Sequence, residues 1–144
     1  MAKTAAARKA HAPAKQTMNR AHGKFHWNEL VTHDPGRAKR FYAATLGWSF
    51  EAMPMPDGRT YWLAKMGDQA VGGMFDARGQ GCEDVAEGWL PYIAVDDVDA
   101  RVAKAVKAGA KIMKPAFDIA NVGRIVMLRE PGGAGVGWIT PACG

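Results

Sequence analysis

A glutamate stands among apolar residues in the stretch Phe25–Thr32, which reads Phe-His-Trp-Asn-Glu-Leu-Val-Thr. If this stretch is a strand, side-chain alternation puts Trp27, Glu29 and Val31 on one face. The other face carries Leu30, which fits against the apolar side of the helix predicted to follow. A carboxylate in apolar surroundings must be hydrogen-bonded, paired with a cation or protonated. Glu29 is therefore the candidate catalytic residue, as a general base, or else an anchor for a ligand.

Several partners for Glu29 stay open. Arg124, in the stretch Gly-Arg-Ile, is one candidate, and an amine or hydroxyl of a ligand is another. Alternatively, Glu29 reaches a surface edge or a structural salt bridge.

Aromatic residues are frequent on the predicted strands. Alternation lets only some of them point the same way as Glu29, so either Tyr61 or Trp62 must point away. Any one of them can instead be ordinary core packing. As a set, together with methionines, they suit a flat or apolar ligand. The residues predicted to bind a ligand are Trp27, Glu29, Trp48, Tyr61, Met74, Tyr92, Arg124, Met127 and Trp138.

Other catalytic chemistries find no support in the sequence. The Gly-Gly pairs at 72–73 and 132–133 lack the spacing of a phosphate-binding loop. Ser49 is the only serine and does not lie in a nucleophile elbow. Cys82 and Cys143 are the only cysteines, which excludes a disulfide framework, and Cys82 has no neighbouring histidine to activate it.

Positive charge is concentrated at the start of the chain. Residues 1–24 contain six Lys and Arg and no acid, whereas the remaining residues contain thirteen basic and fourteen acidic side chains. We expect residues 1–24 to form a disordered basic tail. A weak hold on nucleic acid is the alternative, but the tail lacks aromatics on which bases could stack. With no apolar run of about 18 residues and no signal-peptide core, we expect a cytoplasmic protein without membrane contact.

The remaining chain alternates strand and helix signals in a repeated order. Asp34 and Pro35 predict the start of a helix that ends at Gly47, and Asp96 and Asp97 predict the start of a second helix that ends at Gly109. A strand precedes each helix and three follow it. The predicted strands are 25–32, 48–53, 59–66, 69–75, 89–95, 111–115, 122–129 and 135–140.

The two halves differ in sequence but share the spacing between the aspartate that starts the helix and the glycine that ends it. Asp34 precedes Gly47 by thirteen residues, and Asp96 precedes Gly109 by thirteen, at an offset of 62 residues. This predicts an α+β fold of two βαβββ modules, over residues 25–75 and 89–141, joined by a linker at 76–88. Neither module can bury both faces of its four-stranded sheet alone, so two modules must pair, either within one chain or between two chains. We assign both modules to a single domain, 25–141.

Two such modules resemble the vicinal oxygen chelate superfamily, which includes glyoxalase I, bleomycin-resistance proteins and extradiol dioxygenases. The similar phrases are Leu46-Gly47-Trp48, Val95-Asp96-Asp97-Val98, Gly109-Ala110 and Glu130-Pro131-Gly132-Gly133. The stretch Trp27–Thr32 also resembles a metal-poor, glyoxalase-like branch. The resemblance implies paired mixed sheets around a cup, with Trp27 and Glu29 pointing into it.

The resemblance also implies four positions at which catalytic members hold a metal. Here they correspond to Trp27, Gly73, Leu90 and Gly137, and none of these can ligate a divalent cation through its side chain. We therefore expect no metal and no cofactor. The nearby histidines, His22, His26 and His33, are expected to be exposed or hydrogen-bonded rather than ligands.

Together these points predict a protein that binds a small, aromatic or apolar molecule in a metal-free cup. The alternative is an enzyme of the same superfamily (a lyase, isomerase or dioxygenase-like protein) that uses non-standard metal ligands or Glu29 as a general base. A third possibility is an interaction module that acts through the basic tail. The resemblance further implies a homodimer.

Overall fold

The computed structural model describes residues 21–79 and 85–143 of the 144-residue chain. Most of the predicted basic tail lies outside these residues, as does Cys82 of the predicted linker. No helix in the described ranges is long and apolar enough to cross a bilayer.

Both halves have the predicted order of one strand, one helix and three strands. The first half contains β1 (Phe25–Thr32), α2 (Pro35–Leu46), β2 (Ser49–Pro54), β3 (Thr60–Met66) and β4 (Gln69–Asp76). The second half contains β5 (Gly88–Ala94), α3 (Val98–Lys107), β6 (Lys111–Ile119), β7 (Gly123–Arg129) and β8 (Gly135–Pro141). The predicted α+β fold of two βαβββ modules is therefore confirmed.

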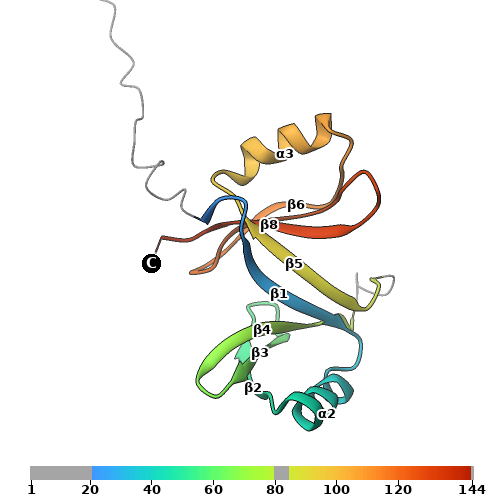
Figure 1. Ribbon diagram of the computed structural model, residues 1–144, viewed down its shortest axis with the longest axis vertical. Coiled ribbons are helices and arrows are strands. Elements are labelled where there is room, and N and C mark those ends of the chain that lie inside the picture. The colour runs from blue at the N-terminus through green and yellow to red at the C-terminus, as the bar shows by residue number, and fades with distance from the viewer. Residues whose placement is uncertain (1–20, 80–84, 144) are drawn as a thin grey trace, which may run out of the picture.

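The strands form one mixed sheet in the order β2-β3-β4-β1-β5-β8-β7-β6. In each half the first strand pairs in parallel with the last, β1 with β4 and β5 with β8. The two halves join within the chain because β1 and β5 pair antiparallel along the middle of the sheet (Figure 1). The two predicted four-stranded sheets are thus edge-to-edge parts of a single eight-stranded sheet.

The cap of α2 forms as its sequence predicts. The Asp34 side chain accepts a hydrogen bond from the Arg37 backbone N–H at 2.9 Å, and Pro35 occupies the first turn, where its missing N–H costs nothing. Gly47 ends the helix in the left-handed conformation, at a φ of 72°, which favours glycine.

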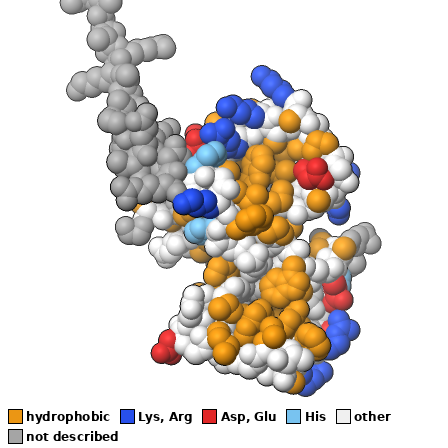
Figure 2. Space-filling model, in the orientation of Figure 1, with side chains coloured by type: hydrophobic (Ala, Val, Ile, Leu, Met, Phe, Trp, Pro, Cys, Tyr) orange, Lys and Arg blue, Asp and Glu red, His pale blue; other side chains and the backbone are white. Residues whose placement is uncertain are grey.

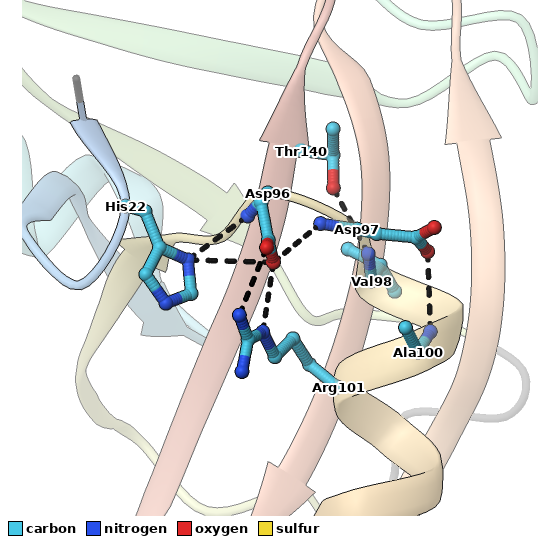
Figure 3. A network of polar contacts seen from close by, with 7 residues as sticks. All are labelled: His22, Asp96, Asp97, Val98, Ala100, Arg101 and Thr140. Carbon is cyan, nitrogen blue, oxygen red and sulfur yellow. Dashed lines mark hydrogen bonds and ion pairs between the residues drawn. The ribbon is translucent and has the colours of Figure 1, made fainter. Parts of the chain in front are cut away.

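The start of α3 differs by one residue from the predicted repeat (Figure 3). Asp97, not Asp96, is the N-cap, and its side chain accepts from the Ala100 N–H at 3.1 Å. Asp96 instead receives two hydrogen bonds from the guanidinium of Arg101, at 2.7 and 2.8 Å. The end of β8 also holds this helix, since the Thr140 hydroxyl accepts from the Val98 N–H at 3.0 Å.

Each helix covers its own half of the sheet. α3 lies over β6, β7 and β8, where Val98, Val126 and Leu128 form a buried cluster, and α2 lies against β2 and β4. Because both helices leave the opposite faces of these strands uncovered, those faces are free to build a site.

Strand β6 is longer than the sequence predicts. The prediction ends it at Pro115, but the strand continues to Ile119. β6 is an edge strand, and its pairing with β7 shifts register between Lys114 and Phe117. A proline is tolerated at such a place because its missing N–H leaves no ladder bond unmade.

Candidate functional site

Both halves of the sheet contribute to one large cavity of about 1250 Å³, which we call the cup. Trp27, Glu29 and Val31 of β1 all border it, as strand alternation predicts. Figure 2 shows hydrophobic side chains at the surface of both halves of the molecule. Apolar and aromatic residues dominate the cup wall, among them Leu63, Phe75, Leu90, Phe117, Ile125 and Met127.

A small polar cluster lies on the cup wall, formed by four side chains from three strands. The Tyr92 hydroxyl donates a hydrogen bond to Glu29 Oε1 at 3.0 Å, and the Tyr61 hydroxyl also hydrogen-bonds the Glu29 carboxylate. Trp27 Nε1–H in turn donates to the Tyr61 oxygen at 2.9 Å. We call Trp27, Glu29, Tyr61 and Tyr92 the carboxylate cluster.

Burial governs the ionisation of this cluster. Desolvation raises the pKa of the Glu29 carboxyl above its ordinary value, although the two tyrosine hydroxyls and the positive charge of Lys114 act to lower it. Burial, and next the nearby negative charge of Glu29, also raise the pKa of Tyr61 and of Tyr92 well above the usual range. Both phenols therefore keep their protons and act as hydrogen-bond donors.

Two glycines make room for the tyrosine rings. A Cβ on Gly73 of β4 would overlap the Tyr61 ring and hydroxyl, and a Cβ on Gly137 of β8 would overlap the Tyr92 ring. Each tyrosine thus occupies the space that a side chain on the neighbouring strand would otherwise fill. No larger residue fits at either position without displacing a member of the carboxylate cluster.

The same two glycines stand at positions where the family resemblance implies metal ligands. The other two positions hold Trp27 and Leu90, and the tyrosine rings fill the space beside Gly73 and Gly137. In the described residues, no three His, Cys, Asp or Glu side chains lie close enough together to hold a metal ion. The residues present at these positions therefore do not fit a divalent cation.

The structure brings five of the nine predicted binding residues together at the cup and places four elsewhere. The five at the cup are Trp27, Glu29, Tyr61, Tyr92 and Met127. The four that do not border it are Trp48, Met74, Arg124 and Trp138.

Three of these four lie on the helix-covered side of the sheet, which corrects their expected direction. Trp48 stacks on Tyr42 of α2 with ring centroids 5.0 Å apart. Met74 is only 2% exposed and pairs with Leu30 between β4 and β1, so its side chain lies on the same helix-covered face of the sheet as that of Leu30. Trp138 packs against the cluster beneath α3.

Arg124 is not the partner of Glu29, contrary to one of the predicted alternatives. Its Nε and Nη2 donate to Asp99 at 2.9 and 3.1 Å, and its Nη1 donates to Asp118 at 3.0 Å. These two carboxylates draw the guanidinium away from the cup. Tyr61 and Tyr92 take the place that the prediction gave to Arg124.

Of Tyr61 and Trp62, only one can point toward Glu29, and in the structure it is Tyr61. Trp62 faces the other side, where the Lys39 ammonium lies 3.3 Å from its ring centroid. This is the arrangement that alternation requires once Tyr61 reaches Glu29.

Some residues that border the cup were not predicted from the sequence. Phe117 and Ile119 border the cup, and the Lys114 ammonium lies 4.0 Å from the centroid of the Phe117 ring. They were missed because the predicted strand ended at Pro115. The alternation of Phe117 with Ile119 is the signal that could have extended it.

Glu87, in the predicted linker, also borders the cup, but its carboxylate is already engaged. It accepts from the Thr32 hydroxyl at 3.0 Å, from the His33 backbone N–H at 2.7 Å, and from Arg37 at 3.2 Å. These bonds lower the pKa of the Glu87 carboxyl, the His33 N–H first, which keeps Glu87 ionised and tied to the start of α2.

Sequence comparison gives a family match across most of the chain. The profile of the Glyoxalase/Bleomycin resistance protein/Dioxygenase superfamily matches residues 24–137. This range includes β1, the carboxylate cluster and both glycines that accommodate its tyrosines.

Curated relatives are similar over the same part of the chain. The chain is 40% identical over 116 residues to "Putative glyoxylase CFP32" of Mycobacterium tuberculosis, covering 80% of this chain and 44% of that protein. It is 36% identical over 113 residues to the "Anthracycline biosynthesis protein DnrV" of Streptomyces peucetius, covering 78% of this chain and 40% of that protein. The chain thus spans less than half the length of these relatives.

Solved structures share the fold at low sequence identity. Methylmalonyl-CoA epimerase from Mycobacterium tuberculosis aligns with a TM-score of 0.57 and 17% identity, over 83% of this chain and 88% of that one. A hypothetical protein, BH1468, from Bacillus halodurans aligns with a TM-score of 0.62 and 12% identity, over 84% and 96% of the two chains. At these identities the likeness concerns the fold alone.

Proposed function

We propose that this chain, which belongs to the glyoxalase/bleomycin resistance protein/dioxygenase superfamily, binds a small and largely apolar molecule in the cup. The observation that carries the proposal is the cup itself, which has a volume of about 1250 Å³ and a mostly apolar wall that contains the half-buried carboxylate cluster. Small-molecule sites commonly combine a large apolar surface with a few polar groups that fix the orientation of the ligand.

The names of two relatives suggest a first ligand to test. They are called anthracycline biosynthesis proteins, and an anthracycline contains a flat polycyclic aromatic system. Trp27, Phe75 and Phe117 border the cup and offer aromatic surface suited to such a ring system. An anthracycline therefore belongs in the ligand panel beside simpler naphthalenes.

Thermal unfolding with a panel of apolar and aromatic compounds tests the proposal. A ligand that binds only the native protein raises the melting temperature, and the increase grows with the logarithm of the ligand concentration relative to Kd. The matched variant is Met127→Lys, which places a charge at a half-buried position on the cup wall and should abolish the shift. If no compound in the panel stabilises the wild-type protein, the proposal fails.

A second candidate function is proton transfer with Glu29 as a general base. It is favoured by the raised pKa of the Glu29 carboxyl, because a base whose pKa lies nearer neutrality accepts a proton more readily. The two tyrosine hydroxyls beside it could donate to an oxygen that gains charge as Glu29 loses it. Such a reaction breaks a C–H bond next to a carbonyl and later re-forms it.

Deuterium exchange distinguishes this candidate from binding alone. 2-Acetylnaphthalene incubated in D₂O with the wild-type protein should lose its methyl proton signal faster than with Glu29→Gln, as followed by NMR. Equal rates with the two proteins, both equal to the rate in buffer, would remove the general-base role for this substrate class.

The other expectations from the sequence stay predictions. A homodimer would be measured by sedimentation equilibrium, and a cytoplasmic location by fractionation of cells. Loss of partner binding on deletion of residues 1–22 would support a role for the basic tail.

A further inference from the structure

The hydrogen-bond donors of the carboxylate cluster are all directed toward one another or toward Glu29. Trp27 Nε1–H is used by the Tyr61 oxygen, and the hydroxyls of Tyr61 and Tyr92 are used by the Glu29 carboxylate. Each of these three side chains has a single polar hydrogen. While Glu29 is ionised, the cluster therefore keeps no donor for a ligand.

What the cluster does offer is acceptor capacity and negative charge. A carboxylate has about four lone-pair positions, and the two tyrosines use two of them. Desolvation makes the remaining charge costly, so a group that donates a hydrogen bond to Glu29, and above all a cation, would relieve that cost.

The other charged groups that border the cup are engaged or exposed. Glu87 is bonded to Arg37, and Arg129 Nη1 donates to the Gly133 carbonyl at 2.9 Å. Lys114, whose charge reaches Glu29, is exposed and rests on Phe117, so solvent screens it. Glu29 is the charged group of the cup wall that accepts hydrogen bonds from neighbouring side chains and still has acceptor capacity for a ligand.

We propose that the cup selects apolar, aromatic molecules that carry an ammonium group or another hydrogen-bond donor, with that donor seated on Glu29, and that it rejects carboxylates. This inference rests on the proposed function and narrows it to a ligand class. An anionic head group would meet the Glu29 charge without a donor in the cluster to offset it.

A matched series on one ring system tests the ligand class. The probes are 2-(aminomethyl)naphthalene, 2-naphthalenemethanol, 2-methylnaphthalene and the carboxylate anion of 2-naphthylacetic acid. Each is titrated by tryptophan fluorescence at pH 7.5. The alcohol and the amine can both donate a hydrogen bond to the Glu29 carboxylate, but only the ammonium adds the attraction of opposite charges, so the amine should bind about tenfold more tightly than the alcohol. The acetate should bind more weakly than the methyl compound.

Two variants assign that preference to Glu29. In Glu29→Gln the amine should lose most of its advantage over the alcohol, while the alcohol itself changes less than about threefold. Glu51→Gln is the matched control, since it removes one negative charge from a carboxylate paired with Lys65 outside the cup. It should keep the full preference for the amine.

The outcomes separate this inference from the proposed function. If the neutral probes bind and the amine shows no advantage, or if the advantage survives in Glu29→Gln, the donor-selective inference is overturned and binding in the cup stands. If none of the four probes binds, the proposed function fails for this ring system, and the inference fails with it. The ranking on the wild-type protein decides the matter even if Glu29→Gln does not fold.

Discussion

Gly73 controls the position of Tyr61, and with it the hydrogen bonds that reach Glu29. Gly73→Ala places a methyl group where the Tyr61 ring lies, so the ring must move or the strand must shift. Overpacking of this kind typically costs about 1–3 kcal/mol. We expect that loss in the free energy of unfolding measured with urea, together with weaker binding in the cup.

The neighbouring Gly72 provides the control for this substitution. A Cβ there would lie 3.1 Å from the Asn28 carbonyl oxygen and 3.7 Å from Trp89, a tight contact but not an overlap with the carboxylate cluster. Gly72→Ala should therefore leave ligand binding close to that of the wild type. Equal loss of binding in the two variants would argue against a specific role for the Gly73–Tyr61 contact.

Glu29 should make stability depend on pH in the direction opposite to that of a paired surface acid. Its pKa is raised on folding, so the folded state holds the proton more tightly than the unfolded state does. Ionisation of Glu29 therefore destabilises the folded protein. This destabilisation is absent below the unfolded pKa of 4.5 and grows as the pH rises toward the folded pKa. Glu29→Gln removes this dependence.

Urea unfolding at a series of pH values measures this effect. The stability of Glu29→Gln relative to the wild type should increase between pH 4.5 and the folded pKa, by at most about 1.4 kcal/mol per pH unit. A constant difference across that range would mean that Glu29 ionises in the folded protein as it does in the unfolded chain.

At the site, alternation along one strand could be predicted, but contacts between strands could not. Trp27 and Glu29 follow from the pattern of β1 alone. Their partners Tyr61 and Tyr92 lie 34 residues from Trp27 and 63 from Glu29, so finding them requires the register between strands. A slip of one residue reverses the faces, which is why Met74 and Trp138 were expected at the cup and lie on the other side.

Among the helices and strands, local chemistry predicted the boundaries where a single residue decides them. Asp34 and Gly47 bound α2 as expected, because a side-chain acceptor and a left-handed glycine are strong end signals. Two adjacent aspartates made the start of α3 ambiguous, and the end of β6 was missed because an edge strand tolerates Pro115.

The ambiguity at α3 leads to a direct comparison of the two aspartates. Asp97→Ala removes the side chain that accepts from the Ala100 N–H, and loss of an N-cap typically costs about 1 kcal/mol. Asp34→Ala should cost a similar amount at α2. Asp68→Ala, in an exposed turn between β3 and β4, is the control and should change stability by less than about 0.5 kcal/mol.

Chemical denaturation with far-UV circular dichroism measures all three variants. If Asp97→Ala is no more destabilising than Asp68→Ala, the hydrogen bond to Ala100 contributes little to stability. Asp96, rather than Asp97, would then be the residue equivalent to Asp34.

For the whole molecule, the helix-start aspartates and helix-end glycines, which repeat at an offset of 62 residues, were enough to predict the architecture. It could not say that β1 and β5 pair within one chain, because edge pairing leaves no signal in either strand alone. In the structure this pairing brings Glu29 of one half beside Tyr92 of the other. The polar cluster thus lies where the family resemblance implies a metal centre shared by both halves.

Because the four positions do not fit a cation, chelation should not affect the fold. Dialysis against EDTA should leave the melting temperature of the purified protein unchanged to within about 1 °C, since only a ligand that binds the native state would stabilise it. A fall of several degrees, reversed by one divalent metal, would contradict the assignment of these positions as unable to bind metal.

The central β1–β5 ladder should also make the two halves unfold together. Each half covers only one face of its strands with a helix, and the pairing of β1 with β5 joins the two as one sheet. Native-state hydrogen exchange should therefore give the amides of β4 and β7 the same free energy of opening. Tyr92→Phe removes a hydrogen bond between the halves and should lower both values equally, by about 1–2 kcal/mol. Opening of β7 at a lower free energy than β4, or a decrease confined to one half, would mean that the modules fold as independent units joined by their edges.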